Sequence, residues 1–218
     1  MGRLMSGDIE HLEIEVKFHL PDPLSMADRL MALGAVAQPK VFERNLCFDD
    51  DCNRLVQAGR LLRLRKDYQC RLTFKSRPRQ QTSDFKIVKE LEVTVSDFDT
   101  MCDMLHALGY CQVRVYEKWR QTFEWEDVLL CLDTLPFGHF LEIEGPCEAI
   151  RNAATQLTLV WNERIIKNYL AIFEVLRDGL SLPFTDVTFD HFEGSRIDIA
   201  PFLPVLYAAK PCEMPHVR

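Results

Sequence analysis

The stretch Glu13-Ile14-Glu15-Val16-Lys17 alternates charged and apolar residues with the period of a β-strand. Because successive side chains of an extended strand point to opposite faces, Glu13, Glu15 and Lys17 share one face. Ile14 and Val16 lie on the other face. A single strand of this kind is ordinary, since exposed strand faces are usually polar. The pattern is informative because it recurs along the chain with a different set of charges each time.

The alternation returns in residues 61–65, 71–75, 90–92, 118–120 and 142–144, and each segment repeats a charge of one sign on one face. The cationic side chains that lie on such faces are Lys17, Arg63, Arg65, Arg71, Lys75, Lys118 and Arg120. The anionic side chains are Glu13, Glu15, Glu90, Glu92, Asp133, Glu142 and Glu144.

A β-sandwich with charged outer faces would explain one such strand, but solvated faces usually mix Thr, Ser, Gln and Lys. Like charges two residues apart repel each other, so folding alone gives no reason to repeat them. A ligand does, because carboxylates bind hard divalent cations such as Mg²⁺, and Arg and Lys bind phosphate oxygens. Strand faces that offer both groups predict a site for a polyphosphate bound together with a metal ion.

Glu13-x-Glu15-x-Lys17 resembles the ExExK signature of the CYTH superfamily, the triphosphate tunnel metalloenzymes. Further segments that resemble the family follow in order at residues 42–49, 61–65, 72–75, 89–93, 116–120, 132–145 and 167–169. The resemblance covers about residues 10–176 and is nearest to the bacterial, class IV adenylyl cyclase-like branch. It implies an α+β fold in which an antiparallel eight-stranded β-barrel forms a tunnel with a polar lumen, covered by helices.

The resemblance also implies roles for the charged residues. The expected ligands of Mg²⁺ or Mn²⁺ are Glu13, Glu15, Glu142 and Glu144, with Glu90, Glu92 and Asp133 as further candidates. The residues expected to bind the triphosphate substrate are Arg63, Arg65, Arg71, Lys75, Lys118, Arg120 and Lys167. The candidate catalytic residues are Lys17, Arg65 and Lys75. They would neutralise charge on the phosphates or position the attacking group.

Two positions depart from the family pattern. Val88 stands where the family usually has Arg, two residues before the central Glu-x-Glu, and Asn168 stands where Ser is usual. Lys86 and Lys89 are near Val88 in sequence, but Lys89 belongs to the opposite face of the strand. One phosphate contact is therefore expected to be missing, which affects the predicted affinity for substrate more than the fold.

Two reactions use the same set of groups. Attack of water on the terminal phosphorus gives a triphosphatase, whereas attack of the ribose 3′-hydroxyl of ATP on the α-phosphorus gives cyclic AMP and pyrophosphate. Hydrolysis is the preferred prediction, because it needs only the polyphosphate, while cyclisation also needs a bound adenosine. A class IV adenylyl cyclase is the first alternative. A non-catalytic module that binds polyphosphate or nucleotide is an alternative of another class, supported by the replacement at Val88.

A chain of 218 residues, 47% of them hydrophobic, is long enough for one well-packed domain. We expect a tunnel domain at residues 8–178 and an irregular C-terminal extension at residues 179–218, which is rich in proline and aromatic residues. The net charge of −7 argues against nucleic acid as a partner. The sequence shows no signal peptide and no apolar stretch of membrane length. Eight cysteines without a Cys-x-x-Cys pair predict a cytoplasmic protein with free thiols. The oligomeric state stays open, with a homodimer as one candidate.

Helices are expected between the strands. Asp22 and Pro23 are typical of the cap and first turn of a helix that ends at Gly34. Ser96 is predicted to cap a second helix, which ends before Gly109. Residues 146–158 and 163–177 are expected to form two more helices. Because one face of each strand is apolar, these amphipathic helices are expected to cover the outside of the barrel.

Overall fold

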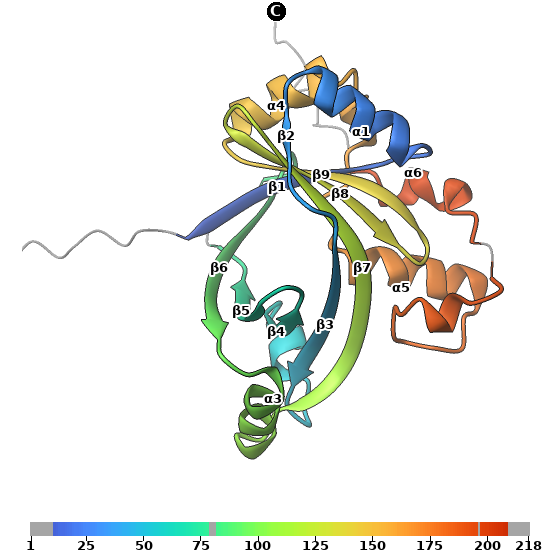
Figure 1. Cartoon of the computed structure of the whole chain (residues 1–218). Helices are drawn as coiled ribbons and strands as arrows, with labels where there is room; N and C mark the ends of the chain where they lie inside the picture. The colour runs from blue at the N-terminus through green and yellow to red at the C-terminus, as the bar shows by residue number, and fades with distance from the viewer. Residues whose placement is uncertain (1–10, 79–81, 196, 209–218) are drawn as a thin grey trace, which may run out of the picture.

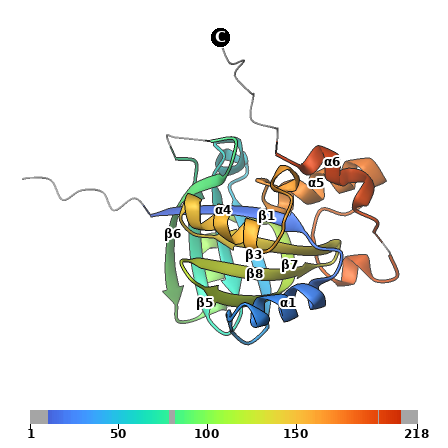
Figure 2. The same cartoon turned by 90° about the horizontal axis from the view of Figure 1, so that it is seen from above.

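The computed structural model describes residues 11–78, 82–195 and 197–208, which are drawn as coloured ribbons in Figures 1 and 2. The predicted start of the tunnel domain at residue 8 lies outside the described residues. So do residue 196 and residues 209–218 of the predicted extension.

Within the described residues the sheet has nine strands, and eight of them close into a barrel. The strands are β1 Leu12–His19, β2 Val36–Ala37, β3 Val41–Asp49, β4 Leu61–Lys66, β5 Cys70–Ser76, β6 Lys86–Val95, β7 Cys111–Trp125, β8 Val128–Leu135 and β9 Gly138–Glu144. They pair in the order β7-β3-β4-β5-β6-β1-β9-β8, and β8 pairs with β7 again. All of these pairs are antiparallel, so the structure confirms the predicted barrel.

The longer helices lie outside the barrel (Figures 1 and 2). The helices are α1 Pro23–Ala32, α2 Arg54–Gln57, α3 Phe98–Ala107, α4 Cys147–Gln156, α5 Tyr169–Leu180 and α6 Leu203–Leu206, with 3₁₀ turns at Trp161–Glu163, Asp190–Phe192 and Ala200–Phe202. In Figure 1, α1 and α4 cover one side, α3 lies at the opposite end, and α5 and α6 lie beside β8 and β9. None of the described helices is both long and apolar enough to span a membrane.

Two predicted helix starts are wrong. Asp97, not Ser96, caps α3, and its side chain accepts a hydrogen bond from the first turn of the helix. The helix predicted to begin at residue 163 begins at Tyr169 instead, after a short 3₁₀ turn. Its start is set by the Asn168 side chain, which accepts a backbone N–H from the first turn at 2.8 Å. In both cases a carboxylate or amide nearer to the apolar run provides the cap.

The apolar faces of the strands form three buried clusters with the helices. The first joins β1, β7, β8 and β9 to α1 and α4, and the second joins the β8–β9 hairpin to α5. The third places α3 against β3, β4 and β7. Because strands alternate, burial of one face under helices turns the charged face of each strand into the lumen. The core of this protein therefore surrounds the barrel, as expected from the alternation.

The C-terminal extension pairs with β7 through Val187. Val187 donates its backbone N–H to the carbonyl of Val115 at 2.8 Å and accepts the N–H of Glu117 at 2.9 Å. This part of β7 extends beyond the segment that pairs with β8, so the extension satisfies backbone groups that would otherwise face solvent. Phe192 packs into the α5 cluster. The boundary at residue 178 stays a prediction, and α5 itself continues to Leu180.

Phe192→Ala should lower the free energy of unfolding by about 3–5 kcal/mol, the usual cost of removing a buried ring. Phe192 is 6% exposed, and its ring contacts the rings of Phe137 and Phe173. Urea denaturation followed by circular dichroism measures the change. Val205→Ala is the matched control, because Val205 belongs to the same extension but is 64% exposed. Equal unfolding midpoints for Phe192→Ala and the control would contradict this packing.

Candidate active site in the barrel lumen

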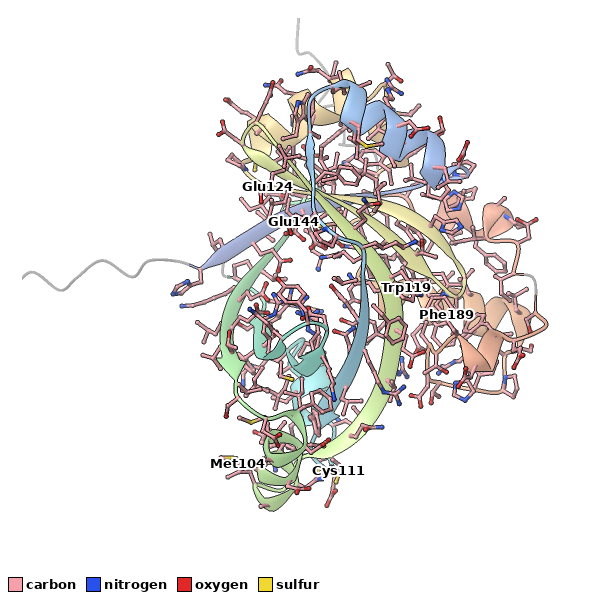
Figure 3. The ribbon with its side chains drawn as sticks, viewed as in Figure 1. Met104, Cys111, Trp119, Glu124, Glu144 and Phe189 are labelled. Carbon is pink, nitrogen blue, oxygen red and sulfur yellow. The ribbon has the colours of Figure 1, made fainter. Side chains whose placement is uncertain are left out.

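A cavity of about 1580 Å³ occupies the barrel lumen. Every site residue predicted from the sequence lines this cavity, with the exception of Asp133. Figure 3 shows Glu144 at the side of the lumen formed by β1 and β9, while Trp119 lies on the outer side of β7 beside Phe189. Alternation along the strands therefore separates the charged inner residues from the apolar outer residues.

Three of the predicted metal ligands come together in this cavity. Carboxylate oxygens of Glu13, Glu15 and Glu144 lie within 4.8 Å of one another. The strand register causes this, because Glu15 on β1 stands directly opposite Glu144 on β9. Burial and the neighbouring Glu142 carboxylate raise the pKa of Glu144 well above its usual value. A set of carboxylate oxygens at this spacing fits a hard divalent cation, which would relieve their mutual repulsion.

The next carboxylate on β9, Glu142, has basic partners instead. It contacts the Lys17 ammonium at 2.6 Å and accepts a hydrogen bond from Arg120 at 2.7 Å. Burial would raise the pKa of Glu142, but Lys17 and Arg120 outweigh burial and hold the pKa well below its usual value. Glu90 and Glu92 on β6 also have cationic partners. Glu90 lies 3.0 Å from Lys75, and Glu92 lies 3.4 Å from Arg65. These three carboxylates therefore neutralise basic residues of the lumen.

Asp133 lies behind the lumen wall rather than in the cavity. It is 1% exposed and accepts hydrogen bonds from Lys118 at 3.0 Å and from Arg120 at 2.6 and 2.5 Å. The Tyr169 hydroxyl donates a further hydrogen bond to it at 2.7 Å. With its oxygens occupied in this way, Asp133 is not brought to the three-glutamate cluster. Strand alternation could not reveal the contact between Asp133 and Tyr169, because Tyr169 comes from a helix.

Lys86 is a lumen residue that the predicted site omits. It lines the cavity beside Val88 and donates a hydrogen bond to Glu15 at 2.7 Å. Burial, Lys17 and Lys75 lower the pKa of Lys86, while Glu15 acts in the opposite direction. Positions 86, 88 and 90 share one strand face, so the alternation already contained this signal. Lys86 places a cation beside the position at which the family usually has Arg.

Glu43 is a second omitted residue. It is 2% exposed, lines the cavity and lies 3.5 Å from Lys118, 3.7 Å from Arg65 and 4.0 Å from Arg120. Burial would raise the pKa of Glu43, but Lys118, Arg120 and Arg65 outweigh burial and lower the pKa to about 2. The alternate positions on either side of it, Val41 and Asn45, are not carboxylates, so the repeated-charge criterion did not select Glu43.

Arginines from β4 and β5 form the opposite wall of the lumen. Arg65 and Arg71 stand directly across from each other in the register, and Arg63 is two residues from Arg65. Arg71 donates a hydrogen bond to Asp67 at 2.7 Å, and Arg65 donates one to Glu92 at 3.4 Å. The Nε–H groups of all three arginines are buried and have no hydrogen-bond partner among the described residues. This wall therefore keeps buried donors available for an anion.

Lys167 enters the cavity from the segment that precedes α5. Lys167, Asn168 and Tyr169 all line the cavity, together with residues of the first turn of α5. Asn168 caps the helix, a function that Ser performs equally well, so the departure from the family pattern has a structural explanation. The cap also fixes where Lys167 and Tyr169 meet the lumen.

A sequence model of the CYTH domain matches residues 11–160. The chain belongs to the CYTH family. A protein of Methanocaldococcus jannaschii named "Putative adenylate cyclase MJ0240" is 27% identical over 135 residues, which are 61% of this chain and 76% of that protein. Family membership confirms the predicted class, an enzyme that acts on triphosphates and depends on metal.

Solved structures share the fold of this CYTH protein at low sequence identity. A Vibrio parahaemolyticus protein described as a "putative adenylate cyclase" has a TM-score of 0.67 and 20% identity, over 75% of this chain and 98% of that chain. PH1012 of Pyrococcus horikoshii has a TM-score of 0.62 and 24% identity, over 72% and 96% of the two chains. The Hippeastrum protein HpAC1, described as revealing a dominant triphosphatase activity, has a TM-score of 0.56 and 21% identity, over 74% and 95%.

Glu43→Gln should lower the free energy of unfolding at pH 7 by about 3 kcal/mol, the value of a pKa shift of this size. The pKa of Glu43 is about 2 in the folded protein, against 4.5 for the free side chain. Because the folded pKa is the lower one, the contribution is present above pH 4.5 and is lost as the pH falls towards 2. Urea denaturation at pH 7, 4 and 3 should show that the difference in free energy of unfolding between wild type and variant becomes smaller as the pH falls. A difference that is constant with pH would contradict the assigned ion pairs.

Proposed function

We propose that this protein is a metal-dependent triphosphatase, in which water attacks the terminal phosphorus. Two cross-strand pairs of like charge carry the proposal: Glu15 faces Glu144, and Arg65 faces Arg71. Opposed like charges destabilise a sheet unless a counter-charge is present. The first pair attracts a cation, the second attracts an anion, and both pairs line one cavity. A triphosphate that carries a divalent cation provides both counter-charges in one ligand.

Glu13, Glu15 and Glu144 would hold the metal, and a purely carboxylate donor set favours Mg²⁺ or Mn²⁺. When bound, the metal supplies Lewis-acid neutralisation of phosphate oxygens. We assign Glu90, Glu92, Glu142 and Asp133 to a different role, because they stand outside the cluster of Glu13, Glu15 and Glu144 and each lies beside basic side chains of the lumen. These four carboxylates hold the cations in place and limit their mutual repulsion.

The basic residues of the lumen bind and orient the substrate. Arg63, Arg65 and Arg71 direct buried N–H groups that suit phosphate oxygens, and Lys75, Lys118, Arg120 and Lys167 add charge along the cavity. Burial lowers the pKa of Lys17, but Glu142 and Glu15 outweigh burial and raise the pKa above its usual range. Lys17 therefore stays an ammonium group. It stabilises negative charge or orients the attacking group by hydrogen bonding, and it does not remove a proton.

Hydrolysis requires fewer contacts between the site and its substrate than cyclisation does. All of the groups assigned above recognise phosphate or metal, and hydrolysis needs no other contact. The structural similarity to the Hippeastrum protein, which is described as having a dominant triphosphatase activity, supports the same choice. The second candidate is a class IV adenylyl cyclase, which the Methanocaldococcus jannaschii relative favours by its name. A non-catalytic binding module loses its main support, because Lys86 supplies a lumen cation beside Val88.

Incubation of the purified protein with tripolyphosphate and, in parallel, with ATP tests the proposal. With Mg²⁺ or Mn²⁺, ³¹P NMR should show orthophosphate and pyrophosphate from tripolyphosphate, and turnover should cease in excess chelator. Cyclic AMP and pyrophosphate from ATP would establish the cyclase instead. Binding of both compounds without any product would identify a non-catalytic module.

Glu144→Gln should weaken binding of Mn²⁺ by more than about tenfold, because one of three clustered carboxylates loses its charge. Titration of Mn²⁺ by electron paramagnetic resonance, without substrate, measures the affinity directly. Glu92→Gln is the matched control, since Glu92 accepts a hydrogen bond from Thr73 at 2.8 Å and lies 3.4 Å from Arg65. The control should bind Mn²⁺ within about threefold of wild type. Equal losses in the two variants would contradict a site built from Glu13, Glu15 and Glu144.

A further inference from the structure

Two ammonium groups of the lumen approach one aromatic ring. Lys17 on β1 is 2% exposed, and Lys118 on β7 is 3% exposed. The Lys17 Nζ lies 5.1 Å from the centre of the Tyr169 ring, and the Lys118 Nζ lies 5.2 Å from the same centre. Both distances fall within the range of a cation–π interaction, which is stronger when the partners are shielded from water. The two lysines come from separate strands, so the ring is a shared contact between them.

The ring itself is held from three directions. Asn168 caps α5 and so sets the position of Tyr169 as the first residue of the helix. The Tyr169 hydroxyl donates to Asp133 at 2.7 Å, and the rings of Phe140 and Tyr169 pack in an edge-type contact with centroids 5.4 Å apart. Tyr169 is only 7% exposed, yet it lines the cavity. A side chain that is fixed in this way can determine where its neighbours lie.

Each lysine also contacts carboxylates. Lys17 contacts Glu142 at 2.6 Å and also pairs with Glu15, whereas Lys118 contacts Asp133 at 3.0 Å. The Tyr169 ring is a further partner, and both ammonium groups share it. The negative face of the aromatic ring attracts both cations and adds no net charge of its own. The ring therefore keeps both ammonium groups beside the cavity without neutralising them.

We propose that Tyr169 is a positioning residue, whose ring holds Lys17 and Lys118 at the cavity wall so that both reach the phosphates of one bound substrate molecule. The inference rests on the proposed function, because it takes a triphosphate as the ligand of the two lysines. Tyr169 itself takes no part in the chemical step. The hydroxyl bond to Asp133 orients the ring, and the ring acts on substrate only through the two ammonium groups.

Calorimetric titration with imidotriphosphate, a non-hydrolysable tripolyphosphate analogue, tests the inference in the presence of Mg²⁺. Tyr169→Leu should bind the analogue about tenfold more weakly, as expected for the loss of two partly buried cation–π contacts. Tyr169→Phe keeps the ring and should stay within about threefold of wild type. Phe173→Leu is the matched control. It removes a buried ring from the same helix and hydrophobic cluster, and Phe173 does not line the cavity. The control should bind the analogue as wild type does.

Combination with Lys118→Met separates positioning from general loss of structure. In the Lys118→Met background, Tyr169→Leu should cost only about threefold in affinity, since a single ammonium remains for the ring to hold. Unchanged binding by Tyr169→Leu, an equal loss in Phe173→Leu, or a tenfold loss that persists in the Lys118→Met background would each overturn the inference. Failure of the wild type to bind the analogue would overturn the proposed function, and this inference with it.

Discussion

Charges inside a closed barrel cannot turn away into bulk solvent, and an unpaired buried ion costs several kcal/mol. In this protein the strand register satisfies that requirement. The oppositely charged lumen pairs that stand directly across neighbouring strands include Lys17–Glu142, Glu15–Lys86, Glu43–Lys118, Lys75–Glu90 and Arg120–Asp133. A slip of one residue in any strand would turn its charged set towards the helices and its apolar set into the lumen. The strand register therefore determines both which face of each strand is buried under the helices and which charges are paired in the lumen.

Among the described residues that line the cavity, the same register leaves two places where like charges stand directly opposite each other. Glu15 faces Glu144, and Arg65 faces Arg71. Neighbouring side chains lessen the repulsion at both places, as Lys86 does for Glu15 and Asp67 does for Arg71. The remaining imbalance has opposite sign on two walls of one cavity. An electroneutral lining would be easier to fold, so the imbalance is best explained by a ligand with a matching distribution of charge.

Much of this arrangement could be predicted from the sequence, because strand alternation decides which side chains face inward. The family resemblance and the alternating charges led to the barrel and to Glu13, Glu15 and Glu144. Alternation could not predict the contact between Asp133 and Tyr169, since Tyr169 belongs to a helix. Glu43 was missed because a single inward carboxylate in a strand looks like an ordinary polar residue. Predicting its importance requires knowledge of which strands become neighbours, and that pairing is a property of the whole fold.

The pairing of β1 with both β6 and β9 affects how the protein folds during its synthesis. Its first strand joins residues 86–89 on one side and residues 140–144 on the other, and Lys17 also exchanges backbone hydrogen bonds with Ile165. Contacts between residues so far apart in the chain give a topology of high contact order, which folds slowly. On a ribosome, the amino-terminal strand must wait, with one edge unpaired, until most of the chain has been synthesised. Glu13 and Glu15, which carry charge along that waiting strand, discourage its association with other chains in the meantime.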